Sequence, residues 1–149
     1  MMLKLLSTSI NLPSLNIVLL LARITVGALM LSHGIPKLMK FFATGDITFS
    51  DPLGVGTIPS LILAIFAEVF CSILVIIGLG TRIAVIPTMI TMLVVIFLVH
   101  MHDPFGKKEL PMLYLTIYTF LLICGSGKYS VDSLLLKKQR NENLAAQNI

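Results

Sequence analysis

The sequence predicts an all-α fold, an integral membrane four-helix bundle with a short amphipathic C-terminal helix at the membrane interface. The first observation is composition: of 149 residues, 56% are hydrophobic and only 12% are charged, with a mean hydropathy of +0.97. Soluble domains carry about 25% charged residues. The second observation is that four long apolar segments follow one another. The third is that proline and glycine residues separate these segments.

The four apolar segments define the predicted domain organisation. A membrane-spanning helix needs roughly 20 apolar residues, and the predicted spans cover about 14–39, 58–77, 83–101 and 110–125. A tight turn joins the second span to the third, because Gly78 and Gly80 can adopt the left-handed conformation and Thr81 can cap the next helix. We therefore predict one membrane domain over 1–136. It ends in an amphipathic helix that begins at Ser130, and a polar, frayed tail follows over 137–149.

Positive charge in the short connections predicts the orientation. With four spans, both termini lie on the side of the turn between the second and third spans. That side carries six positive residues and the other side carries four, namely Lys4, Arg82, Lys128, Lys137, Lys138 and Arg140 against Lys37, Lys40, Lys107 and Lys108. The positive-inside rule then places both termini in the cytoplasm. These residues form no basic face interleaved with aromatic side chains, so the expected partner is membrane lipid and not nucleic acid.

Two opposite charges lie deep inside the predicted spans. Counted from the predicted cytoplasmic helix ends, Arg23 lies about 13 Å into the first span and Glu68 about 15 Å into the second. A lone ion at that depth costs several kcal/mol. We therefore predict a structural ion pair between Arg23 and Glu68. The alternative is a protonated Glu68 and an Arg23 side chain that extends toward the interface.

The end of the first span is unusually polar, and it reads "SHGIPK". His33 and Lys37 are four residues apart and share a helix face. Pro36 cannot donate the backbone hydrogen bond that the carbonyl of Ser32 would accept, so a kink is expected. Gly27 and Gly34 lie on the same stripe and allow a neighbouring helix to approach closely. The segment therefore predicts a polar inner surface toward the extracytoplasmic end.

The third span ends at the same level in "VHMHDPFGKKEL". This segment brings His100, His102 and Asp103 near His33 and Lys37, and Glu109 opens the fourth span there. Alternatives apply to several of these residues. His102, Asp103, Lys107 and Lys108 are most simply explained as a solvated loop. Glu109 also interacts favourably with the helix dipole at a helix N-terminus, which is a structural reason for its position.

This predicted cluster matches the needs of a quinone head group. Such a head group needs hydrogen-bond donors at two carbonyls and a proton path, within an apolar pocket. The predicted quinone site therefore comprises His33, Lys37, His100 and Glu109. Haem between His33 and His100 is a weaker alternative. We predict no metal site, because the two histidines of "HMH" point to different helix faces and no cysteine joins them.

Four motifs, taken in order, resemble the DoxX family of small bacterial membrane proteins. They are "RITVGALMLSHGIPKL", "AEVFCSILVIIGLGTRIA", "ELPMLYL" and "GSGKYSVDSLL". The resemblance covers about 20–136, and the matching positions are Arg23, Gly27, His33, Gly34, Lys37, Glu68, Gly78, Thr81, Arg82, Glu109, Gly125, Gly127, Lys128, Ser130 and Asp132. It implies a four-helix protein of the bacterial inner (cytoplasmic) membrane. Related sequences occur in quinone-linked sulfur-oxidising membrane subunits, and members have been linked to thiol redox and oxidative-stress functions.

Three functions remain open at this stage. The first is a quinone-associated redox subunit that works with a soluble redox partner. The second is a non-catalytic membrane scaffold that recruits a soluble redox or secretion partner. The third is a small-molecule carrier, for which a homo-oligomer would have to supply additional spans. Cys71 and Cys124 lie at depths that differ by roughly 8 Å, which disfavours a thiol–disulfide enzyme acting alone. Whether the chain is catalytic is not decided by these motifs.

Overall fold

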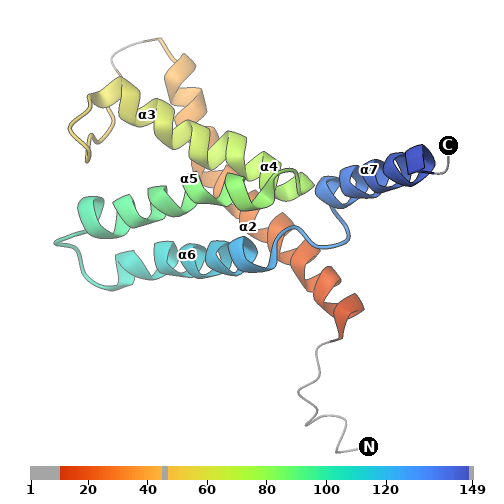
Figure 1. Cartoon of the computed structure of the whole chain (residues 1–149). Coiled ribbons are helices and arrows are strands. Elements are labelled where there is room, and N and C mark those ends of the chain that lie inside the picture. The colour runs from red at the N-terminus through yellow and green to blue at the C-terminus, as the bar shows by residue number, and fades with distance from the viewer. Residues whose placement is uncertain (1–10, 45–46, 148–149) are drawn as a thin grey trace, which may run out of the picture.

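The computed structural model describes residues 11–44 and 47–147, and these form helices and connecting loops without a β-strand (Figure 1). The first helix is α2 (Leu12–Phe42), and the second is continuous through α3 (Thr57–Ile65), the π-helical segment η1 (Phe66–Cys71) and α4 (Ser72–Ile77). The third comprises α5 (Thr81–Val94) and the π-helical segment η2 (Val95–Val99), and α6 (Gly106–Cys124) and α7 (Val131–Gln147) follow. Residues 1–10 of the predicted domain and 148–149 of the predicted tail lie outside the described residues.

Three of these helices are long and apolar enough to cross a membrane, over Leu12–Phe42, Thr57–Ile77 and Thr81–Val99. Large apolar side chains are exposed along them, as expected for surfaces that face lipid. The prediction of an all-helical fold is confirmed for the described residues, and these three helices correspond to the first three predicted spans. The predicted fourth span corresponds to α6, whose first turn carries Lys107, Lys108 and Glu109. In this fold α6 packs against α5 and α2.

Two glycines set how closely α2 approaches the second helix. A Cβ atom on Gly27 would overlap the side chain of Ile76, and a Cβ atom on Gly34 would come 2.9 Å from the backbone of Glu68. Small residues at such a crossing let two backbones come close. This confirms the predicted close-approach stripe, and it places Gly34 level with Glu68. α2 stays helical through Pro36, where the sequence predicts a kink.

The predicted turn between the second and third helices is present. Gly78 and Gly80 have φ values of +73° and +57°, a region that glycine occupies readily. The cap of α5 differs from the prediction. The backbone N–H groups of Gly80 and Thr81 donate to the carboxylate of Asp132, at 2.7 and 3.4 Å, and Thr81 itself is the first residue of the helix. The chain after α6 therefore returns to fix this turn.

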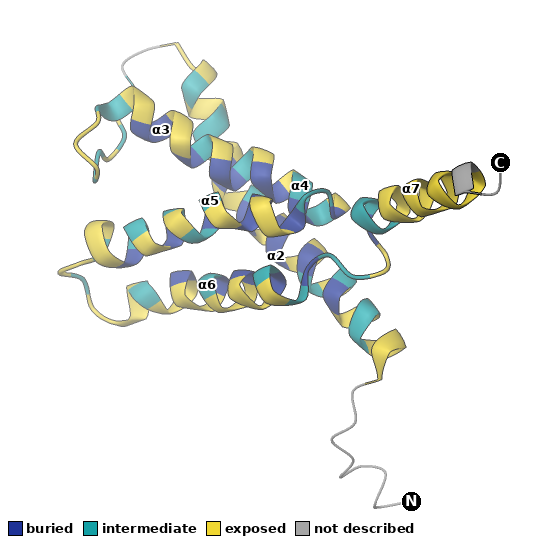
Figure 2. Ribbon diagram, in the orientation of Figure 1, coloured by how far each residue is buried: buried dark blue, intermediate teal, exposed yellow. Residues whose placement is uncertain are grey.

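The C-terminal helix is longer than the sequence suggested. Its predicted start is confirmed, because the Ser130 hydroxyl accepts a hydrogen bond from the backbone N–H of Ser133 at 3.1 Å. The residues predicted as a frayed tail continue the helix to Gln147, and a Lys138–Glu142 pair at 3.9 Å supports it there. α7 projects away from the other helices, and its residues 134–145 are exposed (Figures 1 and 2).

The buried residues form a core between the helices, and the outward faces are exposed (Figure 2). We name the two ends of the bundle by their connections. The turn end contains the Gly78–Gly80 turn. The pocket end contains the two longer loops, before α3 and between η2 and α6. The π-helical segment η2 lies at the pocket end of the third helix, and η1 lies near the middle of the second; π-helical turns recur at functional sites.

Candidate functional site

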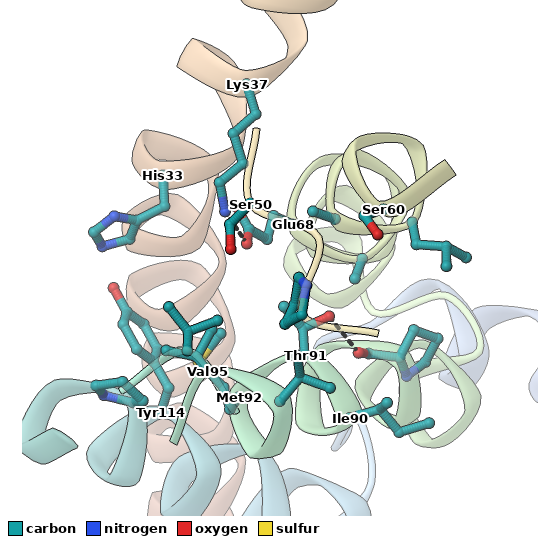
Figure 3. Close-up of a pocket in the computed structure, with 18 of the residues that line it drawn as sticks. His33, Lys37, Ser50, Ser60, Glu68, Ile90, Thr91, Met92, Val95 and Tyr114 are labelled. Carbon is teal, nitrogen blue, oxygen red and sulfur yellow. Dashed lines mark hydrogen bonds and ion pairs between the residues drawn. The ribbon is translucent and has the colours of Figure 1, made fainter. Parts of the chain in front are cut away.

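A cavity of about 670 Å³ opens at the pocket end, between α2, the second helix, the third helix and α6. The loop before α3 closes part of it through Phe49, Ser50 and Leu53. Most of the lining is apolar, and a small number of polar side chains from different helices point toward the same space (Figure 3). A mainly apolar pocket with a few convergent polar groups is the usual form of a small-molecule site.

The most buried charge at the cavity belongs to Glu68, which is only 2% exposed. Its Oε1 atom pairs with the ammonium group of Lys37, whose side chain is 28% exposed. The other carboxylate oxygen, Oε2, is buried and has no hydrogen-bond partner among the described residues. The Lys37 ammonium also lies 5.8 Å from the ring centre of Phe49, within cation–π range. Lys37 therefore connects the buried carboxylate to the loop that covers the cavity.

The predicted ion pair between Arg23 and Glu68 is wrong. Arg23 is fully buried at the turn end, where its Nη2 donates to the carbonyl oxygen of Tyr129. It packs against Gly78, so closely that a Cβ atom there would overlap the guanidinium. Ten residues separate Gly78 from Glu68, a rise of about 15 Å. The prediction assumed that the start of the first helix and the end of the second lie at the same level. In the structure α2 begins eleven residues before Arg23 and extends beyond the turn.

His33 and Tyr114 form the wall of the cavity next to the ion pair. Their rings meet edge to face with centroids 6.0 Å apart, and Tyr114 in turn stacks on Tyr118 at 6.3 Å. Figure 3 shows both side chains on the same side of the cavity as Lys37. His33 was predicted as a site residue and Tyr114 was not. A tyrosine within an apolar helix gives no signal by itself, although its spacing from Lys107 and Leu110 could have placed it on the same face.

His100 lies at the mouth of the cavity and belongs to a small charged cluster. Its Nδ1 atom lies 2.7 Å from a carboxylate oxygen of Asp103, and Lys107 lies 3.3 Å from the other oxygen. The hydrogen bond with His100, helped by Lys107, holds the pKa of Asp103 below its ordinary value. His100 and Lys107 both line the cavity. His102 is exposed and is not part of this lining.

Glu109, the fourth predicted site residue, does not line the cavity. The cavity face of α6 is formed by Lys107, Leu110, Pro111 and Tyr114. These positions follow the spacing of three and four residues that keeps side chains on one helix face. Glu109 falls two residues from both Lys107 and Pro111, so its side chain lies on another face, and it is exposed. The structure therefore brings together His33, Lys37 and His100, but not Glu109.

The loop over the cavity is fixed by Asp51. Its carboxylate accepts hydrogen bonds from the Ser60 hydroxyl at 2.6 Å and from the backbone N–H groups of Gly56 at 2.7 Å and Val55 at 3.1 Å. The bond from Ser60, with those from the backbone, lowers the pKa of Asp51 below its ordinary value. Lys40 of α2 also bonds to the carbonyl oxygen of Thr48. These contacts give the cavity a defined wall on this side.

Comparison with known proteins identifies the family. The model of the DoxX family matches residues 18–101, which include Arg23, His33, Lys37, Glu68 and His100. A Bacillus subtilis (strain 168) protein named "Putative oxidoreductase CatD" is 29% identical over 134 residues, covering 89% of this chain and 98% of that protein. No solved structure matches. The match over more than half of the chain, together with the motifs in its helices, shows that the chain belongs to the DoxX family.

Proposed function

We propose that this protein is a quinone-associated redox subunit that holds the quinone head group in the cavity at the pocket end. The observation that carries the proposal is the pairing of Lys37 with the buried Glu68 in the wall of an otherwise apolar cavity of about 670 Å³. A buried ion pair adds little stability compared with apolar packing. Intramembrane charges that face a cavity instead commonly mark a ligand or proton site.

The residues present fit a quinone. The ammonium of Lys37 and the side chains of His33 and Tyr114 can donate hydrogen bonds to carbonyl oxygens, and the apolar lining suits the ring and its tail. Glu68 can accept and release protons through Lys37 or through its unpartnered oxygen. A bound quinone would supply reversible two-electron, two-proton chemistry. His100, at the mouth with Asp103 and Lys107, would exchange protons with the aqueous side.

In this proposal α6 is the fourth membrane span and α7 lies at the membrane interface. The exposed Leu134, Leu135 and Leu136 would face lipid, and Lys137, Lys138 and Arg140 follow directly. The count of six positive residues against four supports an orientation with both termini in the cytoplasm. The pocket end then faces the extracytoplasmic side of a bacterial inner membrane. The electrons would be exchanged with a soluble redox partner, in line with the oxidoreductase name of the relative.

The cavity also bears on the two other functions. A pure scaffold needs only a filled bundle with an exposed docking surface, and it gives no reason for a cavity with charged walls. A carrier needs a polar path through the bundle. The quinone site accounts for the cavity and for the buried charges together, so we prefer it.

Binding measurements test the proposal. We would extract quinone from the purified protein and titrate it with a soluble quinone analogue, comparing wild type with His33→Ala and Tyr114→Phe. Each loss of a hydrogen-bond donor should weaken binding about fivefold to tenfold, because one such bond contributes about 1 kcal/mol. Glu109→Gln is the matched control, since Glu109 lies near the pocket end but outside the cavity, and it should bind like wild type. Absence of saturable binding in a folded sample would refute the proposal.

A further inference from the structure

The interior of the bundle is layered along its axis, and the layers can be counted from the turn end. The first layer is polar and contains the buried residues Arg23, Thr81 and Ser130. Arg23 and Ser130 lie directly against Gly78. Asp132 completes it through its bonds to the turn. This layer has contacts with the chain that follows α6, and it lies about 15 Å from Glu68.

The second layer is apolar and comes from all four helices of the bundle. Its residues are Val26, Val75, Val85 and Leu121, one from each helix. Each lies three or four residues along its helix from a residue near the turn, namely Arg23, Gly78, Thr81 and Gly125 in the same order. These offsets correspond to a rise of about 5–6 Å from the turn. All four side chains are buried, at 0–1% exposure, and they belong to one packed cluster. The buried side chains described at this level are therefore apolar on every helix.

The third layer is polar again. Ser72, Thr88 and Tyr118 are all fully buried and lie about 9–11 Å from the turn. The hydroxyl groups of Ser72 and Tyr118 have no hydrogen-bond partner among the described residues. One helical turn further lie Glu68 and Tyr114, which line the cavity. The polar groups thus continue inward from the cavity for one turn and end at the valine and leucine layer.

We infer that the layer of Val26, Val75, Val85 and Leu121 is a proton barrier, so that the cavity exchanges protons and ligand with the pocket end alone. This rests on the proposed function only for the identity of the ligand. A ring of apolar side chains excludes water, and without water or hydroxyl groups a proton has no carrier. Protons then reach the polar groups of the cavity only from the pocket end, and the cavity is not part of a channel through the bundle. A carrier function would need this layer to open.

Proton flux into liposomes tests the barrier without any quinone. Purified protein would be reconstituted with an entrapped pH-sensitive dye, and flux would be driven by a potassium gradient with valinomycin. Wild type should match protein-free liposomes. The variant Val75→Ser/Leu121→Ser replaces two barrier residues by small polar ones. It should raise the flux about tenfold, which corresponds to a barrier lower by about 1.4 kcal/mol.

Two further variants make the test decisive. Ile73→Ser/Ile123→Ser makes the same chemical change on the same helices at exposed positions, 45% and 69% exposed, and it should remain as tight as wild type. Val75→Thr/Val85→Thr keeps the side-chain volume, so it serves if the serine variant does not fold, and it should also leak. A leak in wild type, or folded barrier variants that stay tight, would overturn the inference. Loss of quinone binding with this flux pattern intact would refute only the proposed function.

Discussion

The ammonium group of Lys37 pairs with the carboxylate of Glu68 across the interface of α2 and η1, although Lys37 lies about 5 Å further toward the pocket end. The pair forms because helical side chains lean toward the N-terminus of their helix. The lysine of α2 therefore reaches back over Gly34, where the two helices are closest. The same contact fixes the helix register and lines the cavity, and the ammonium of Lys37 also lies near Phe49 in the covering loop.

The first prediction concerns the stability of this pair. Lys37→Met leaves the buried carboxylate of Glu68 without its partner. Such a change costs about 3–5 kcal/mol for a fully buried pair, and we expect the lower end because Lys37 is 28% exposed. The double variant Lys37→Met/Glu68→Gln removes both charges and should recover most of the loss. The chain contains no tryptophan, so far-UV circular dichroism in mixed micelles is the suitable measure. Equal destabilisation by both variants would contradict the pairing.

The second prediction compares the two glycines of the turn. Both adopt positive φ, so alanine at either position costs about 1–2 kcal/mol of backbone strain. At Gly78 the added methyl group would also meet the Arg23 guanidinium and come 2.6 Å from the Cβ atom of Ser130, whereas at Gly80 it would meet nothing within 4 Å. Gly78→Ala should therefore lower the free energy of unfolding clearly more than Gly80→Ala. Equal effects would show that Arg23 does not pack against the turn.

The third prediction concerns the pH dependence of the loop over the cavity. The pKa of Asp51 is lowered in the folded protein, mainly by the hydrogen bond from Ser60. Its bonds therefore stabilise the loop above the unfolded pKa of about 3.9, and this contribution is lost as the pH falls through the lower folded pKa. In wild type, a carboxyl ¹³C NMR titration of Asp51 should give a midpoint below about 3.9, the pKa of an unperturbed aspartate. Ser60→Ala should raise this midpoint, and Ser50→Ala, at a nearby serine, should leave it unchanged.

Much of the helical architecture was predictable, because it depends on local sequence. Apolar length predicted the helices, and Gly78 and Gly80 predicted the turn through their backbone freedom. The Ser130 cap was also a local signal. The cap of α5 was not, because its acceptor is Asp132, which is 52 residues away from Gly80 in the sequence. The helical end of α7 was missed because its polar composition suggested fraying.

The residues that line the cavity were predicted in part, and the errors come from how the helices are shifted and rotated relative to one another. His33, Lys37 and His100 were placed correctly at the cavity because each ends an apolar run at the same end of the bundle. The partner of Glu68 depends on how far α2 is shifted along the second helix, and no sequence signal gives that shift. Which of Glu109 and Tyr114 faces the cavity depends on the rotation of α6 about its axis. Counting helix faces from Lys107 would have favoured Tyr114.

Photoaffinity labelling with an azidoquinone, followed by mass spectrometry of the labelled peptides, tests the central claim most directly. The protein should be labelled on the cavity faces of α2 and α6, at residues near His33 and Tyr114. An excess of quinone without the azido group should suppress this labelling, and His33→Ala should reduce it while Glu109→Gln should not. Labelling confined to the lipid-facing surfaces, or labelling that unmodified quinone does not suppress, would contradict a quinone site in this cavity.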